Sequence, residues 1–261
     1  MRKFEGMNYL KSLVILTVVA GTLVACKKKE EESDCDIAPT PTLKVDVLPQ
    51  YGSNTLYLDS IYDTQEGYRV KFTDIKFYLE NVRSGSNQLI DAGLFDYRER
   101  GTLLLSAQGS PENFPTLEGN MGVDASINHD DPSAFPNDSW LNISNSNDMH
   151  WGWNPGYIFV KVEGKVDTIP DATDLLDHNM VFHVGLDVNM RTLSISNVQW
   201  SNQGNDLHSY ALKLDMQEFL NGTISGDPID LKTEYTSHSA AGQEAITTNL
   251  ANNFRDALGP F

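Results

Sequence analysis

The chain contains, at residues 149–163, the stretch MHWGWNPGYIFVKVE, in which a tight turn leads into a strand. The central letters NPG are typical turn formers, and the residues after them favour a strand because they are aromatic and β-branched. If the part before the turn is extended, Met149, Trp151 and Trp153 share one side of it. His150 then points to the other side.

The grouping of methionine, tryptophan and histidine in this stretch can be interpreted in two ways. Thioether and imidazole groups bind soft metal ions, and aromatic faces attract cations. Two tryptophans beside a turn are also normal content of a hydrophobic core. Residue types alone leave both interpretations open.

The rest of the body also consists of short expected strands separated by Gly, Pro, Asn and Asp. Residues 43–48 and 68–72 alternate between apolar and polar, and the aromatic residues 75–82 are expected to pair with 68–72. Short strands without regular intervening helices predict an all-β fold, an antiparallel β-sandwich or barrel. No repeat or internal boundary is visible, so residues 43–261 are expected to form one domain. Further expected strands are 102–106, 157–166, 180–186, 192–198 and 210–216.

One helix is predicted, over about residues 240–258 near the C-terminus. Its apolar positions recur every four residues and form a stripe that can pack on a sheet. Ser239 is expected to cap the helix, and the Gly-Pro at 259–260 to end it. A helix lying on a membrane surface is the alternative, but its polar face lacks the basic residues that anionic lipid attracts.

Residues 1–25 predict a lipoprotein signal peptide. Three basic residues precede an apolar run that ends in Leu-Val-Ala directly before Cys26. Cleavage before Cys26 would place lipid on that residue, and the charged, Pro- and Thr-containing residues 26–42 predict a flexible linker. We therefore expect a lipoprotein of the outer membrane or cell surface, held by acyl chains. An ordinary cleaved signal peptide is the alternative.

The overall charge excludes several classes of protein. With 19 basic and 36 acidic residues and a pI near 4.6, the chain lacks the basic surface that nucleic acid requires. Two cysteines cannot build a disulfide-rich scaffold or a four-thiolate zinc site. No nucleophile elbow, phosphate loop or metalloprotease motif is present, so we do not expect an enzyme.

Eight pieces of the sequence occur in an order that resembles the MbnP-like copper-binding family, related to MbnP and more remotely to MopE and CorA. The main piece is the Met-(aromatic)-Trp-x-Trp-x-x-Gly-Tyr-x-Phe-x-Lys-x-Glu pattern at 149–163. The Asn-His-Asp at 128–130 and the Phe-His-Val-Gly at 182–185 follow the family pattern as well. Shorter similarities are 72–82, 89–92, 122–124, 212–222 and the Ser-His-Ser at 237–239.

The resemblance implies a copper-binding β-sandwich outside the cytoplasm, in its lipoprotein branch. In relatives histidines hold the metal, and a tryptophan can be oxidised to kynurenine by a partner diheme peroxidase-like enzyme. Carried over to this chain, the main ligand candidates are His129 and His183. Trp151 or Trp153 is the position open to oxidation. The chain departs from the pattern in having no cysteine in its body and in carrying His150 where relatives have Phe or Tyr.

The remaining ligand candidates have weaker support. His238 precedes the expected helix, and Met149 offers a thioether that suits Cu(I), the expected oxidation state. His150 is a further candidate, whereas His178 and His208 are expected in loops. For each histidine the alternative is a hydrogen-bonded core or surface residue.

Two other functions stay open. Oxygen-rich residues between 124 and 138 offer ligands for calcium, although their spacing does not match an EF-hand. A metal-free β-sandwich binding module is the second possibility. Its aromatic platform for a carbohydrate or peptide would consist of Trp140, Trp151, Trp153 and Tyr157.

Overall fold

The computed structural model describes residues 40–152, 155–169 and 175–261. The predicted signal peptide and linker, with Cys26 and Cys35, lie outside these residues, and so does Trp153. The described residues form two curled β-sheets that pack face to face. The all-β sandwich with a C-terminal helix, which the sequence predicts, is confirmed.

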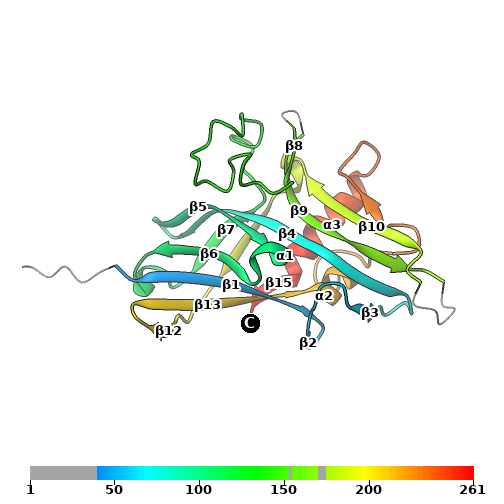
Figure 1. The fold of residues 1–261 in the computed structure, drawn as a ribbon, viewed down its shortest axis with the longest axis horizontal. Helices are drawn as coiled ribbons and strands as arrows, with labels where there is room; N and C mark the ends of the chain where they lie inside the picture. The colour runs from blue at the N-terminus through cyan, green and yellow to red at the C-terminus, as the bar shows by residue number, and fades with distance from the viewer. Residues whose placement is uncertain (1–39, 153–154, 170–174) are drawn as a thin grey trace, which may run out of the picture. The chain divides into compact units, whose positions relative to one another are not determined.

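The first sheet contains six strands within the described residues. They are β1 (Thr42–Tyr51), β2 (Asn54–Thr55), β6 (Leu103–Gln108), β12 (Ser201–Gly204), β13 (Leu207–Asp215) and β15 (Leu258–Pro260). Strand β1 lies at the centre and pairs with β2, β6 and β13. In Figure 1 this sheet is the lower layer of the molecule.

The second sheet contains nine strands within the described residues, and its central path runs β11-β7-β4-β9-β10-β14. These strands are β3 (Ile61–Asp63), β4 (Arg69–Ser84), β5 (Asn87–Asp96), β7 (Leu117–Met121), β8 (His150–Gly152), β9 (Gly156–Asp167), β10 (His178–Gly185), β11 (Arg191–Ile195) and β14 (Thr236–Ser237). Strands β3 and β5 pair with β4, and β8 pairs with β9. The short helices are α1 (Tyr97–Arg100), α2 (Met216–Asn221) and two 3-10 turns, η1 (Pro111–Asn113) and η2 (Asp187–Asn189).

Strand β4 differs from expectation. The sequence suggests two strands that pair, at 68–72 and 75–82, but the structure has one strand across both. The register of β4 against β9 shifts between Phe72 and Asp74, which marks a β-bulge at Thr73. A bulge interrupts the apolar–polar alternation without ending the strand, and so it imitates a boundary in the sequence.

Among the described strands, two pairs are parallel, although most pairs are antiparallel. Strand β1 runs parallel to β13, and β10 runs parallel to the short β14. Both pairs join segments that are distant in the sequence. The second pair brings residues 236–238 beside His183.

The core between the sheets is built from alternating positions. In β1 every second residue is buried, and β4 contributes Phe72, Ile75 and Phe77. Helix α3 (Glu244–Ala257) packs Leu250 and Phe254 into the same core, with the Phe254 ring 5.4 Å from that of Phe77. The packing predicted for this helix is therefore confirmed. Among the described residues, no helix combines the length and the apolar character needed to cross a membrane.

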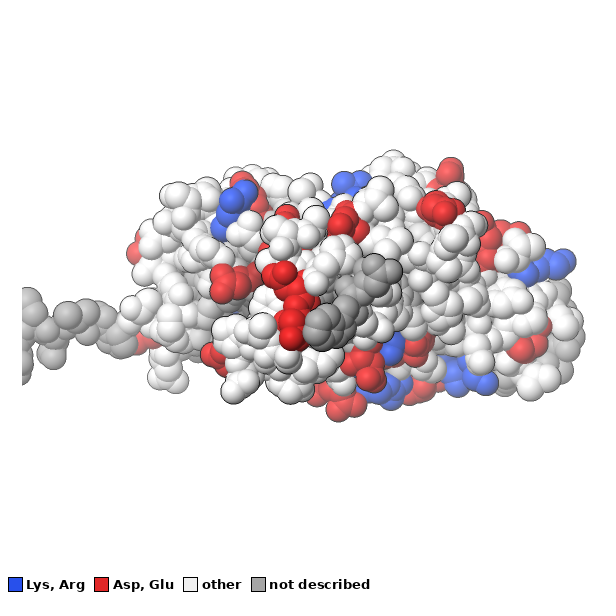
Figure 2. Space-filling view, turned by 90° about the horizontal axis from the view of Figure 1, so that it is seen from above, with Lys and Arg blue, Asp and Glu red and all other residues white. Residues whose placement is uncertain are grey.

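The long loop at residues 122–149 covers one end of the second sheet and is visible in green above β5 and β7 in Figure 1. A second, smaller core anchors it, in which Tyr78 and Tyr157 are wholly buried. Tyr78 donates to the backbone oxygen of Trp140 at 3.0 Å, and Tyr157 donates to that of Leu141. The loop is thus tied to β4 and β9 by hydrogen bonds that water cannot easily replace. Figure 2 views this side from above and shows acidic side chains scattered over it.

Candidate metal centre

His183 and His238 face each other at the end of β10. Phe182 is the partner of Ser237 in the parallel β10–β14 pair, so the residues that follow them, His183 and His238, lie side by side. The two Nδ1 atoms are 3.3 Å apart, and the rings meet edge to face with centroids 4.9 Å apart. His183 is half-buried and His238 is exposed, so the pair is open to solvent on one side.

Glu163 fixes the orientation of the His183 ring. It lies on the neighbouring strand β9, and its Oε1 is 2.8 Å from His183 Nε2. A carboxylate only accepts hydrogen bonds, so Nε2 carries the proton and the lone pair of Nδ1 points toward His238. Burial lowers the pKa of His183 below its ordinary value, which favours the neutral ring that a metal ion requires.

A row of alternating charges continues from Glu163 across the sheet. Lys161 lies 3.4 Å from Glu163 and 3.4 Å from Asp74 on β4. Lys76 then lies 3.4 Å from Asp74 and 3.3 Å from Asp96. Burial raises the pKa of Asp74. For Glu163 burial acts in the same direction, but the hydrogen bond from His183 and the Lys161 charge outweigh it and lower the pKa.

Ser239 holds the His238 segment against β10 and does not cap the helix. Its Oγ donates to the His183 carbonyl at 2.9 Å and accepts from the Gly185 backbone N–H at 3.0 Å. The N-cap of α3 is Gln243, whose side chain instead accepts from the His238 backbone N–H at 2.9 Å. The predicted cap is wrong because Ser239 lies too far before the first helical turn.

Trp151 packs beside the histidine pair. It lies on β8, and its ring centroid is 6.3 Å from that of His183. The ring occupies the space next to Gly185, where a Cβ would come closer than 3.0 Å to the indole. The structure therefore places one of the two candidate tryptophans next to His183, whereas Trp153 lies outside the described residues.

His129 contacts a different partner. Its Nε2 is 3.2 Å from Asp187 Oδ2, and the side chain is exposed. Its wholly buried neighbour Asn128 donates to Asp187 Oδ1 at 2.7 Å and accepts from the Tyr157 backbone N–H at 2.9 Å. In the described residues, no hydrogen bond or ion pair joins His129 to His183 or His238.

Met149 and His150 lie in and beside the small core. Met149 is wholly buried there. The His150 ring meets Tyr157 edge to face at 4.7 Å, and its buried Nε2 has no hydrogen-bond partner among the described residues. Burial lowers the pKa of His150. These contacts keep Met149 away from solvent and place His150 against an aromatic ring.

The remaining histidines lie elsewhere. His178 stacks on Tyr235 at 4.5 Å and approaches Asp177, while His208 lies on β13 in the other sheet. In the acidic loop, Asp124 and Asp131 accept hydrogen bonds from nearby serines. Among the described residues, no three His, Cys, Asp or Glu side chains group around a common metal position.

The aromatic platform is not assembled as expected. Tyr157 is wholly buried, so it cannot be part of an exposed surface. Trp151 faces Gly185 and His183, and Trp140 lines a separate pocket between β5 and the 122–149 loop. The three expected members within the described residues therefore belong to different local environments.

The fold and this site define an all-β domain with a histidine pair at the edge of one sheet. The model of the MbnP family matches residues 40–240, a range that includes both His183 and His238. The chain belongs to the MbnP family. The solved structure of MbnP from Methylosinus trichosporium is similar to it at 17% identity and a TM-score of 0.44, covering 72% of this chain and 78% of that one. No curated protein matches the chain significantly.

Proposed function

We propose that this protein is a membrane-tethered lipoprotein that binds copper outside the cytoplasm through His183 and His238. The observation that carries the proposal is the pair of Nδ1 atoms, 3.3 Å apart, with His183 Nε2 already engaged by Glu163. This separation lets one ion reach both nitrogens at an ordinary imidazole–metal distance of about 2.0 Å. Membership of a copper-associated, extracytoplasmic family supports the choice of metal and compartment.

The donor set favours copper over zinc or calcium. Zinc sites take three or four protein ligands, and calcium takes oxygen ligands. Imidazole nitrogens are common copper ligands, and we propose Cu(I) as the bound state. Without metal, the same two nitrogens share one proton, which His238 Nδ1 donates to His183 Nδ1.

The residues around the pair have separate roles. Glu163 keeps His183 in the tautomer that presents its Nδ1 lone pair, and Ser239 fixes the backbone on which His238 is carried. Trp151 shields one side of His183 and is the proposed position of oxidation to kynurenine by a diheme peroxidase-like partner. The protein itself captures, stores or delivers copper and does not catalyse a reaction.

Native mass spectrometry of protein purified from its natural host tests this proposal. One copper ion per chain is expected, with loss of the ion in His183→Ala and in His238→Ala. His208→Ala on the opposite sheet is the matched control and should keep the ion. If His129→Ala loses the copper ion and His238→Ala keeps it, His129 is a ligand and the proposed His183–His238 pair is refuted.

A second mass spectrum, recorded after digestion of the same protein, reports the mass of each tryptophan-containing peptide. A kynurenine at Trp151 is expected, and an unmodified Trp151 beside a loaded copper site would show that binding does not need the oxidised side chain. Cleavage before Cys26 with an acylated N-terminus would establish the lipid anchor.

A further inference from the structure

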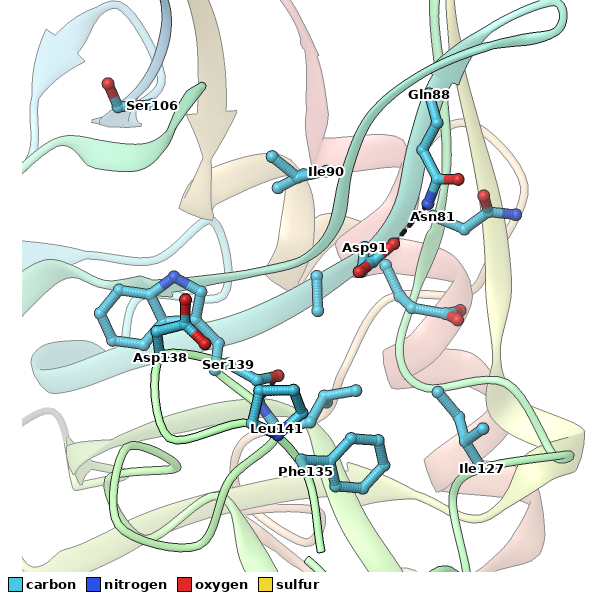
Figure 3. Close-up of a pocket in the computed structure, with 14 residues that line it drawn as sticks. Asn81, Gln88, Ile90, Asp91, Ser106, Ile127, Phe135, Asp138, Ser139 and Leu141 are labelled. Carbon is cyan, nitrogen blue, oxygen red and sulfur yellow. Dashed lines mark hydrogen bonds between the residues drawn. The ribbon is translucent and has the colours of Figure 1, made fainter. Parts of the chain in front are cut away.

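A second concave site lies on the molecule, between the β4–β5 hairpin and the 122–149 loop. It is a pocket of about 660 Å³, and its lining includes none of the residues around the histidine pair. Figure 3 shows Gln88, Ile90 and Asp91 on the strand side and Phe135 and Leu141 on the loop side. A volume of this size is typical of small-molecule sites, which span roughly 300–1,000 Å³.

The charged side chains that line the pocket are all acidic. Glu80, Asp91 and Asp138 line the pocket, and no Lys or Arg side chain does. Asp91 is held by the amide of Gln88 at 2.6 Å, and neither Asp91 nor Asp138 forms an ion pair within the described residues. An electrostatic field of this kind selects cations and rejects anions.

Glu80 is the informative member of this set because it is buried. Only 8% of the residue is exposed, yet among the described residues its carboxylate has no cationic partner; it accepts hydrogen bonds from the Asn120 amide at 3.2 Å and from the Asp124 backbone N–H. Burial raises the pKa of Glu80 and the charges of Asp124 and Asp91 act in the same direction, whereas the two hydrogen bonds lower it. A buried carboxylate is normally paired with a positive charge, so the pocket lacks the counter-charge that Glu80 requires.

The remaining walls are apolar and aromatic. Ile90, Ile127 and Phe135 line the pocket together with Trp140. The Arg100 guanidinium lies 4.0 Å from the centroid of the Trp140 ring and forms a cation–π contact with it. Arg100 does not line the pocket, and it donates to the Leu94 carbonyl.

A metal ion does not fit these features. The three carboxylates do not form a ligand cluster within the described residues, and the volume is many times that of one ion. We propose that the pocket binds a small organic ammonium ion, with its positive group at Glu80 and its apolar body against Phe135 and Trp140. This site is independent of the histidine pair, because the two share no residue.

The experiment uses metal-free protein and two probes that differ in one group. Tyramine carries an ammonium group on an apolar ring, and 4-ethylphenol has the same ring and chain without the nitrogen. Binding is followed by calorimetry and by the NMR shift of the Trp140 indole N–H, assigned with Trp140→Phe. Tyramine should bind and shift this signal, and 4-ethylphenol should bind at least about tenfold more weakly.

Variants test the placement of the charge. Glu80→Gln should weaken tyramine binding by about tenfold or more, and the loop variant Asp138→Asn should weaken it by a smaller factor. Glu112→Gln removes an exposed carboxylate outside the pocket and is the matched control. The His183→Ala/His238→Ala double variant should bind tyramine as the unmodified protein does, which separates this site from the copper proposal.

Three results would overturn the inference: no binding of tyramine at millimolar concentration, equal binding of 4-ethylphenol, or equal binding by Glu80→Gln. Asp138 lies on an exposed loop, so Asp138→Asn gives a test that does not depend on how a buried substitution folds.

Discussion

The indole of Trp151 rests against the backbone of Gly185, in the space that a side chain at residue 185 would fill. Gly185 is the last residue of β10 and lies two residues after His183. The absence of a side chain there is what lets the tryptophan approach the histidine pair. The contact therefore sets both the stability of this corner and the position of the proposed oxidation site.

Gly185→Ala should displace Trp151, because the added Cβ would meet both the indole and the Tyr157 carbonyl. We expect the free energy of unfolding to fall by about 1–3 kcal/mol, the usual cost of overpacking. Urea unfolding measures the loss, and near-ultraviolet circular dichroism reports the tryptophan environment. Gly259→Ala on β15 is the control, since a Cβ there meets nothing within 4 Å. Equal stability of both variants would show that Trp151 is not held by this contact.

Glu163→Gln should weaken copper binding while leaving the fold intact. The substitution removes the negative charge that holds His183 Nε2, and the loss of such a partner typically costs about 10–100-fold in metal affinity. Competition with a chromogenic Cu(I) chelator measures the change. Glu118→Gln removes a carboxylate from an exposed ion pair on the same sheet and should have no effect. Unchanged affinity in Glu163→Gln would separate this residue from the metal site.

Lys161→Met should destabilise the protein by about 1–3 kcal/mol, because it removes the buried ammonium shared by Glu163 and Asp74 and leaves Asp74 with Lys76 alone. The double variant Lys161→Met/Asp74→Asn should regain part of the loss, since Asp74 then carries no charge to compensate. Lys165→Met, an exposed lysine on the same strand, is the matched control. Thermal unfolding of the four proteins gives the comparison, and a double variant that is less stable than Lys161→Met would contradict the charge row.

Stability should depend on pH through Glu80, with a defined sign. Burial raises the pKa of Glu80 in the folded protein above its ordinary value of 4.5, so the folded state holds this proton more tightly than the unfolded chain does. The contribution of Glu80 to stability therefore falls as pH rises from 4.5 through the raised value.

Glu80→Gln should consequently be more stable than the unmodified protein at neutral pH, and the difference should vanish at pH values below 4.5. Urea midpoints measured at both pH values test the sign. Glu112→Gln should show no such pH-dependent difference. A Glu80→Gln variant that is less stable at neutral pH would mean that the carboxylate is stabilised by its surroundings.

Most of the fold follows from local patterns in the sequence. Strands β1, β9 and β10 alternate or are rich in β-branched residues, and the apolar stripe of α3 has helical spacing. No sequence pattern predicts the parallel pairing of β10 with β14. Only two residues of each strand are paired within the described residues, which is too few to show an alternation. The bulge at Thr73 was also not predicted, because an inserted residue breaks the apolar–polar alternation in the same way as the end of a strand does.

The candidate site could be foreseen only in part. His183 and His238 were both candidates from their short motifs, but the sequence gives no reason to place residues 55 positions apart in contact. Glu163 was part of the quoted pattern without a role, and its role depends on the β9–β10 register. No role was predicted for Asn128, next to His129, although this buried residue connects the loop to β9 by a hydrogen bond.

The parallel contact between β10 and β14 has a consequence for when the site exists. His183 lies on β10, whereas His238 belongs to the segment just before α3, 55 residues further along the chain. A nascent, truncated or still unfolded chain carries both imidazoles but cannot bring them together. In the proposed function, metal loading would therefore follow folding and would report that the chain has folded.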